Sequence, residues 1–165
     1  MTSLLEAPLI SQTRRNHGLE HATLHVLASR FPGKPLAGHS NPKGFLIFGQ
    51  VPVEAVAESA IQALDRMKAG EKGLAIHPGC GTNYLVAGAF GGGLAWLSML
   101  GARNNRERMS RLLPAILMAT LGFMVSQPVG PLVQERITTS GEVSGLVIDG
   151  VYVVRPGLCR VATHS

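Results

Sequence analysis

Two long apolar stretches dominate the pattern of hydrophobic and polar positions along this chain. No Asp, Glu, Lys or Arg occurs from Gly73 to Ala102 or from Leu112 to Gln134. A helix needs roughly 20 residues to cross the hydrocarbon core of a bilayer, and both stretches reach that length. A surface helix would carry a polar stripe, which the run from Tyr84 to Leu100 lacks. We therefore expect a transmembrane helical hairpin over Gly79–Ala102 and Leu112–Val133, with two buried helices of a soluble α-hairpin as the alternative.

Small residues and prolines add detail to this expected hairpin. Gly88 and Gly92 are four positions apart in the first stretch. Small residues at that interval let two helices approach closely in lipid, so we expect this face to contact the second helix. Pro128 and Pro131 lie near the end of the second stretch and predict that its helix bends or ends near Gln127.

The sequence before the first apolar stretch has the pattern of an α-β-β-α unit over residues 1–77. Ser11–Phe31 has the spacing of an amphipathic helix, with a serine or threonine near its start as the N-cap. The turn signal Asn41–Gly44 predicts a β-hairpin. Val53–Ala69 repeats apolar residues at helical spacing and is followed by a glycine, so a second amphipathic helix is expected there.

The segment after the second apolar stretch is rich in β-branched residues. Ile137–Thr139 and Gly145–Val154 predict a C-terminal β-hairpin and tail over residues 134–165, which could extend the earlier hairpin into one sheet. The expected fold class is therefore an α+β membrane protein. It comprises the N-terminal α/β unit, a two-helix transmembrane hairpin over residues 78–133, and a short C-terminal β segment.

Composition and charge agree with a membrane location. Hydrophobic residues make up 45% of the chain and charged residues 15%, below the ~25% charged residues of soluble domains. The connector Arg103–Arg111 holds four arginines and one glutamate, which suits anionic lipid headgroups. Basic and aromatic residues are not interleaved, so we expect no nucleic acid partner. The lipid bilayer is the expected partner of an integral membrane protein.

Sidedness and disulfide bonding follow less directly from the sequence. Residues 1–16 lack the pattern of a signal peptide. The positive-inside rule places Arg103–Arg111 in the cytoplasm, but the N-terminal region is also basic, and the two arguments conflict. A disulfide between Cys80 and Cys159 would need an oxidising compartment, and an unbonded thiol at Cys80 is the simpler interpretation.

The N-terminal helix carries a group of residues with metal-binding chemistry. His17, Glu20, His21 and His25 fall within an arc of roughly 140° on one helix face. Two histidines four positions apart on a helix can share one metal ion. A neighbouring carboxylate can then act as a general base toward a water molecule that the metal activates. His17, His21 and His25 are therefore predicted metal ligands, and Glu20 is the predicted catalytic base.

A second group of ligands precedes the first apolar helix. His77 and Cys80 are good ligands for a soft metal ion and lie in a glycine-rich loop. Either residue could supply a third ligand and complete a tetrahedral site with one open position. His39 lies in an expected turn and His164 in the tail, so we interpret both as solvated side chains.

The pattern His-x-x-Glu-His resembles the zinc-binding motif of the inverzincin metallopeptidases. This resemblance covers five residues and implies that His17 and His21 bind zinc while Glu20 activates water. Gly18 within the motif weakens a helix by up to ~1 kcal/mol relative to alanine. The inverzincins take their third ligand from a downstream glutamate. Here the candidates for that ligand are Glu54, Glu58, Glu71, His77 and Cys80.

Nearly the whole chain also resembles a family of uncharacterised bacterial membrane proteins defined as a domain of unknown function. The resemblance is carried by Asn16–Thr23, by Gly44–Gln50 followed by a helix, and by Ala75–Asn83 before two apolar helices. It implies the architecture given above and a location in the bacterial plasma membrane. It implies no activity.

Two functions from different classes are compatible with these patterns. The first is a membrane-anchored, zinc-dependent hydrolase, with a peptidase as one form, in which His17, His21 and one of His77 or Cys80 bind the metal. The second is a non-catalytic membrane subunit whose histidine face binds a metal or haem structurally, with iron as the alternative ion, or packs against a partner. A homo-oligomer or a larger membrane complex would supply that partner.

Overall fold

The computed structural model describes residues 4–165, and these divide into two compact units. The first unit contains the chain up to His77 together with Glu135–Ser165, and we call it the α/β unit. The second unit is Pro78–Gln134, and we call it the hairpin unit. The C-terminal segment therefore belongs to the same unit as the N-terminal helix.

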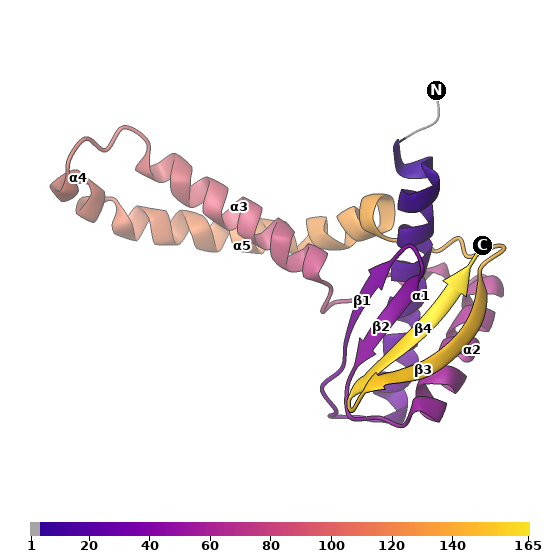
Figure 1. Ribbon diagram of the computed structural model, residues 1–165. Helices are drawn as coiled ribbons and strands as arrows, with labels where there is room; N and C mark the ends of the chain where they lie inside the picture. The colour runs from indigo at the N-terminus through magenta and orange to yellow at the C-terminus, as the bar shows by residue number, and fades with distance from the viewer. Residues whose placement is uncertain (1–3) are drawn as a thin grey trace. The chain divides into compact units, whose positions relative to one another are not determined.

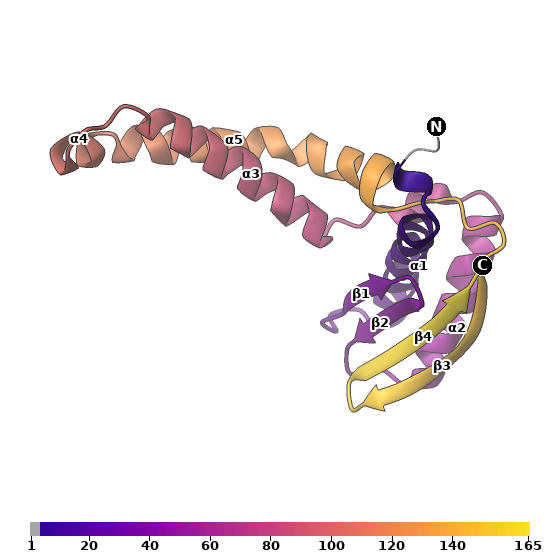
Figure 2. The same cartoon turned by 45° about the horizontal axis from the view of Figure 1, so that its top comes forward.

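The α/β unit contains two helices and a four-stranded sheet. Its helices are α1 Pro8–Arg30 and α2 Val53–Lys68, and its strands are β1 Ala37–Asn41, β2 Gly44–Phe48, β3 Val147–Arg155 and β4 Leu158–His164. The strand order is β1-β2-β4-β3, and all neighbouring strands are antiparallel. Both helices cover the same face of the sheet (Figures 1 and 2). The predictions of an α+β fold and of a C-terminal β-hairpin are confirmed, but the hairpin pairs β3 with β4, which was expected to be part of the tail. Strand β4 also joins this hairpin to β2.

Apolar side chains between the two helices and the sheet form the core of this unit. Leu19 and Leu27 of α1, Val56 of α2, Phe45 of β2 and Val161 of β4 are all fully buried. Burial of one such side chain contributes roughly 1.5–3 kcal/mol. The helical spacing in α1 and α2 and the period of two in β2 therefore place one apolar face of each element on a shared core.

Two local predictions for this unit are wrong. Helix α1 begins at Pro8 after Ala7 and has no serine or threonine cap, because a proline at the first helical position needs no partner for a backbone N–H. Ile137–Thr139 is not a strand, because a π-helix over Gln134–Thr138 follows the preceding helix without a break. β-branched residues favour strands only where a sheet offers them a neighbour.

The hairpin unit consists of α3 Gly81–Met99, the short helix α4 Asn105–Ser110, and α5 Leu112–Val133. Helices α3 and α5 run side by side, and α4 lies at their far end (Figures 1 and 2). Helix α5 continues past Pro128 and Pro131 to Val133, so it does not end near Gln127, and the alternative of a bend there stays a prediction. A packed neighbouring helix and a local π-turn allow a helix to accommodate prolines, and α5 has both.

Helices α3 and α5 approach each other most closely at two glycines. A Cβ atom added to Gly122 would lie 2.5 Å from the carbonyl oxygen of Phe90, and Gly91 is the buried residue of α3. Gly88 and Gly92 have no atom within 4 Å of an added Cβ. The two glycines of the expected pattern therefore face away from α5. Gly91, which lies between them in the sequence, makes the contact instead.

Within residues 4–165, one helix is long and apolar enough to cross a membrane, and it spans Leu112–Thr138. This result supports association with a membrane. Helix α3 does not qualify, because five of its 19 residues are glycine and its first turn contains Thr82 and Asn83. The expectation of two independent spans is thus corrected to one candidate span with a glycine-rich partner helix.

Replacing Gly122 by alanine tests the packing of the hairpin. We expect Gly122→Ala to destabilise the α3–α5 pair by about 1–3 kcal/mol, because the new methyl group would overlap the Phe90 carbonyl. Gly92→Ala is the matched control and should be neutral or stabilising by up to ~1 kcal/mol, since its site is open. Unfolding of the full chain in dodecyl sulfate, followed by Trp96 fluorescence, measures both. Equal midpoints for the two variants would contradict this contact.

Candidate metal centre

Four of the predicted site residues lie together in the α/β unit. His17, His21 and His25 come from successive turns of α1, and His77 follows the short 3-10 helix Lys72–Ala75. The ring centroids of His17 and His21 are 4.4 Å apart, those of His21 and His77 are 5.5 Å apart, and those of His25 and His77 are 4.8 Å apart. The structure thus joins two groups of histidines that are separated by 52 positions in the sequence.

Two loops close on α1 beside these histidines, and Gly18 makes their approach possible. A Cβ atom at Gly18 would overlap the carbonyl oxygen of Ser140 and would lie 3.2 Å from the Cβ of Ala75. Any larger residue would push both loops away from the helix. The glycine that weakens the helix in the sequence pattern is therefore required by the tertiary packing.

Backbone carbonyls of these loops fix the histidine rings. His17 Nδ1 lies 2.9 Å from the carbonyl oxygen of Thr138, and His21 Nδ1 lies 2.7 Å from that of Ala75. A carbonyl oxygen only accepts, so Nδ1 carries the proton in both rings and Nε2 carries the lone pair. Histidines that bind metals usually donate their second ring N–H in this way, which orients the ring and strengthens the ligand.

His25 has the opposite tautomer. Its Nε2 lies 2.9 Å from the carbonyl oxygen of Ile76, so the lone pair is on Nδ1. His25 therefore holds the segment before His77 against α1. It would need its other nitrogen to bind a metal ion.

Burial keeps His77 neutral. Partial burial, together with the nearby His25 and His21, lowers the pKa of the His77 imidazole from 6.5 to about 4. The neutral imidazole is the form that binds a metal ion. His77 is thus in its metal-binding form at neutral pH.

Glu20 lies at the edge of the histidine face that is nearest to β1. Its side chain is 4% exposed. The Ser40 hydroxyl donates a hydrogen bond to its carboxylate, and Gly38 packs directly against the carboxylate. The sequence pattern gave no sign of this contact with β1. The role of Glu20 as a base stays a prediction.

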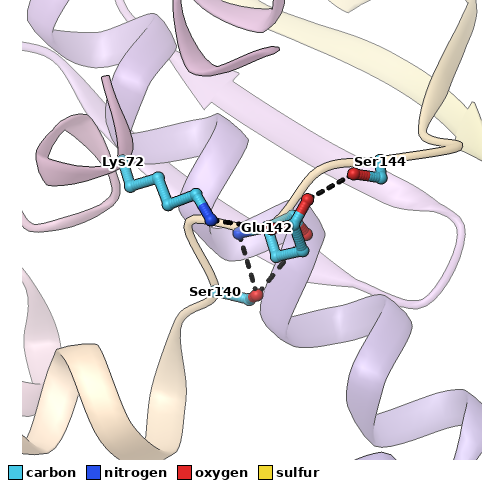
Figure 3. A network of polar contacts seen from close by, with 4 residues as sticks. All are labelled: Lys72, Ser140, Glu142 and Ser144. Carbon is cyan, nitrogen blue, oxygen red and sulfur yellow. Dashed lines mark hydrogen bonds and ion pairs between the residues drawn. The ribbon is translucent and has the colours of Figure 1, made fainter. Parts of the chain in front are cut away.

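An ion pair between two exposed side chains, Lys72 and Glu142, joins the two loops (Figure 3). Lys72 Nζ lies 2.8 Å from the Glu142 carboxylate, and the Ser144 hydroxyl donates to the same carboxylate. The Glu142 N–H also donates to the Ser140 hydroxyl at 3.2 Å. These contacts join the segment that positions His21 to the segment that positions His17.

Sequence reasoning missed a polar residue that anchors α1. Asn16 is fully buried, and its amide nitrogen donates to the carbonyl oxygens of Asn41 and Pro42 at 2.9 and 3.2 Å. The Thr163 hydroxyl donates to the Asn16 amide oxygen at 2.7 Å. The partners are backbone groups and a residue 147 positions away, so no local pattern could have indicated them. Asn16 fixes the rotation of α1 one residue before His17.

Neither Cys80 nor Cys159 forms a disulfide in the described chain. Cys159 lies in the core on β4, where burial and the nearby Glu54 raise its pKa. Cys80 is the N-cap residue of α3 and belongs to the hairpin unit. Three residues of chain span at most roughly 10 Å, so the backbone alone keeps Cys80 within that distance of His77.

The hairpin unit contains a groove of about 330 Å³ near the start of α3. Its lining is mainly apolar, with carboxamide and hydroxyl groups among the apolar side chains. It is formed by Pro78, Asn83, Tyr84, Ala87, Phe123, Ser126, Gln127, Gly130 and Pro131. The Gln134 amide donates a hydrogen bond at 2.7 Å to the side chain of Asn83, which is one of these lining residues. Pro78 directly follows His77, so the groove begins one residue after a predicted ligand.

Fold and site together define an α+β protein with a partly buried histidine cluster and an apolar helical hairpin. Residues 12–151 match the family model described as "Domain of unknown function (DUF6391)", and the chain belongs to this family. It is 33% identical to "Uncharacterized protein SYNPCC7002_A1392" of Picosynechococcus sp. (strain ATCC 27264 / PCC 7002 / PR-6). The alignment covers 77% of this chain and 65% of that protein. No solved structure matches the chain significantly.

The Lys72–Glu142 contact gives the loops a measurable pH dependence. Hydrogen bonds from Lys72 and Ser144 lower the pKa of Glu142 from 4.5 to about 2. A carboxyl group with a lowered pKa stabilises the fold above pH 4.5, and this contribution is lost as the pH falls toward about 2. We expect Glu142→Gln to reduce the loss of thermal stability over this range. Lys72→Gln is the partner control and should have the same effect, whereas an unchanged acid profile in both would contradict the contact.

Proposed function

We propose that this chain is a membrane-anchored, zinc-dependent hydrolase with its metal at the histidine cluster. The observation that carries the proposal is the arrangement of His17 and His21. Their ligand nitrogens lie within 4.8 Å of each other, and each ring donates its Nδ1 proton to a carbonyl. Two imidazoles that share a tetrahedral zinc ion at ~2.0–2.1 Å have ring centroids roughly 5 Å apart. The observed ring separation of 4.4 Å is close to that value.

A third ligand is available from the segment that follows the 3-10 helix. The His77 ring is 5.5 Å from that of His21, which also suits a shared zinc ion. Cys80 is the alternative, because three residues of chain tie it to His77. A set of two histidines with a further histidine or a thiolate is a ligand set that zinc prefers.

The chain's own groups can support hydrolysis at this site. A zinc ion there would activate a water molecule as a Lewis acid. Glu20 precedes His21 directly, and we assign it the role of taking up the proton from that water. Within the hairpin unit, the groove lined by Pro78 and its neighbours offers apolar walls for side chains and carboxamides for polar groups. A peptide has both kinds of group, so we propose a peptidase.

The hairpin unit is the proposed membrane anchor. Large apolar side chains on both of its long helices are exposed instead of forming a core, as lipid contact would require. They include Leu85, Phe90, Trp96, Leu97, Leu113, Ile116, Leu117, Phe123, Met124 and Leu132. Helix α5 would cross the bilayer, with α3 beside it through the contact at Gly91 and Gly122. The plasma membrane of a bacterium is the proposed location, since the relative from Picosynechococcus is bacterial.

One observation favours a second function, that of a non-catalytic membrane subunit. All three histidines of α1 donate a ring N–H to a carbonyl of the unit's own loops. The cluster could therefore only hold these loops against α1, a role that we call a structural latch. Alternatively, it could hold a zinc, an iron or a haem without turnover. In this function the exposed apolar helices would contact other subunits of a homo-oligomer or of a larger membrane complex.

The metal content of the detergent-purified full chain tests the proposed centre. We expect about one zinc ion per chain by elemental mass spectrometry, and its loss in the His17→Ala, His21→Ala double variant. His39→Ala, His164→Ala is the control for a general loss of histidines, because both residues lie away from the cluster. Absence of bound metal after reconstitution would eliminate the hydrolase and leave the structural latch.

The Glu20→Gln variant separates the two functions once metal is present. Loss of a general base lowers turnover by about 10²–10⁴-fold, so we expect hydrolysis of fluorogenic casein to fall by that factor with the zinc content unchanged. Glu58→Gln is the matched control, because that exposed carboxylate on α2 pairs with Arg30 outside the site. Equal turnover in both variants would contradict the assignment of Glu20. No turnover in the wild-type holoprotein would favour the non-catalytic subunit.

A further inference from the structure

All charged residues of the hairpin unit are concentrated at its far end. The segment 103–111, which we call the arginine tip, contains four arginines and one glutamate, and the two long helices of the unit contain no charge. Arg103, Arg106 and Arg108 are exposed, and Arg111 is half-buried. The hairpin unit is therefore apolar along both long helices and basic in the segment that connects them.

The glutamate of the tip does not neutralise the arginines, because its carboxylate caps the backbone. Asn104 accepts a hydrogen bond from the Glu107 N–H at 2.9 Å. The Glu107 carboxylate in turn accepts from the Arg103 N–H and from the Asn104 side chain, both at 2.8 Å. This reciprocal capping box uses both carboxylate oxygens. The ion pairs among residues 4–165 include no arginine of the tip.

The surroundings of the arginines are apolar. Trp96 is 63% exposed and Met109 is 69% exposed, and Leu100, Leu112 and Leu113 beside them are exposed as well. A tryptophan next to basic residues is typical of the boundary between hydrocarbon and headgroups. An arginine there can bury its aliphatic stem and keep its guanidinium at the polar level. If the tip bound a nucleic acid instead, these exposed apolar side chains would remain in contact with water.

We infer that the arginine tip binds the headgroups of anionic phospholipids. The inference rests on the proposed membrane anchoring, and it adds the class of lipid and the residues that select it. Guanidinium groups bind phosphate through paired hydrogen bonds, and the tip offers three that have no acidic partner. Helix α5 has 22 residues, which corresponds to ~33 Å at 1.5 Å per residue, and the hydrocarbon core is ~30 Å thick. That length places the tip at headgroup level when α5 crosses the bilayer.

Quenching of the single tryptophan by brominated lipids tests this inference. Trp96 lies three residues before the end of α3, next to the tip. The full chain is reconstituted into vesicles of phosphatidylcholine and phosphatidylglycerol in which one of the two lipids carries bromine in its acyl chains. Each basic residue near an anionic surface favours it about fivefold. We therefore expect brominated phosphatidylglycerol to quench Trp96 at least about twofold more than its mole fraction accounts for.

Substitutions identify the residues that cause the preference. Arg103→Gln, Arg106→Gln, Arg108→Gln should bring the quenching down to the mole fraction, and lysine at the same three positions should restore most of it. The matched control is Lys34→Gln, Lys43→Gln, Arg155→Gln, which removes three exposed cations from the α/β unit and should leave the preference intact. The metal content should be the same in all variants.

The outcomes separate this inference from the proposals on which it rests. Quenching by both lipids in proportion to their amounts would overturn the binding of anionic headgroups and keep the anchor. No quenching by either lipid would overturn both the anchor and this inference, while the metal measurement would still decide the hydrolase. An RNA probe that binds the wild type and is lost in the glutamine variant, without any lipid preference, would make the tip a nucleic acid surface and would also overturn it.

Discussion

The hydrogen bonds from the histidines of α1 to backbone carbonyls are the interactions on which the site depends. The carbonyls of Thr138, Ala75 and Ile76 lie outside the sheet, at the C-terminal ends of the π-helix and the 3-10 helix from which the two loops continue. A buried carbonyl without a partner is costly, so the histidine donors stabilise both loops as well as orient their own rings. Gly18 permits this approach, and the Lys72–Glu142 pair closes the loops on the outside. His17 and His21 thus hold these segments against α1 and are also the ligands of the proposed metal centre.

A second constraint is the different placement of apolar residues in the two units. The α/β unit buries its apolar residues in one core, whereas the hairpin unit exposes most of its large apolar side chains. Contact between α3 and α5 at Gly91 and Gly122 covers only a narrow stripe of each helix. The remaining surface would be unfavourable in water, and lipid or another apolar partner would relieve that cost. The hairpin unit begins at Pro78, directly after His77, so the proposed anchor follows a proposed metal ligand in the sequence.

Periodicity in the sequence predicted the elements of the α/β unit, because each places one apolar face on the core. The C-terminal hairpin was predicted from its β-branched residues, but Ile137–Thr139 was mistaken for a strand where the chain continues as a π-helix. Composition suggested two spans, yet glycines lower the hydropathy of α3 and leave one candidate. The proximity of the histidines on α1 followed from helical spacing. Their contact with His77 and the anchor at Asn16 depend on tertiary packing that no local pattern encodes.

X-ray absorption of the zinc-loaded full chain tests the metal centre most directly, because it reports the ligand atoms themselves. We expect two or three imidazole nitrogens at ~2.0–2.1 Å, with a sulfur atom at ~2.3 Å if Cys80 is the third ligand. Cys80→Ser would then remove the sulfur shell, and Cys159→Ser would leave it in place. A spectrum with oxygen ligands alone, unchanged by substitution of His17 and His21, would contradict a metal centre at this cluster.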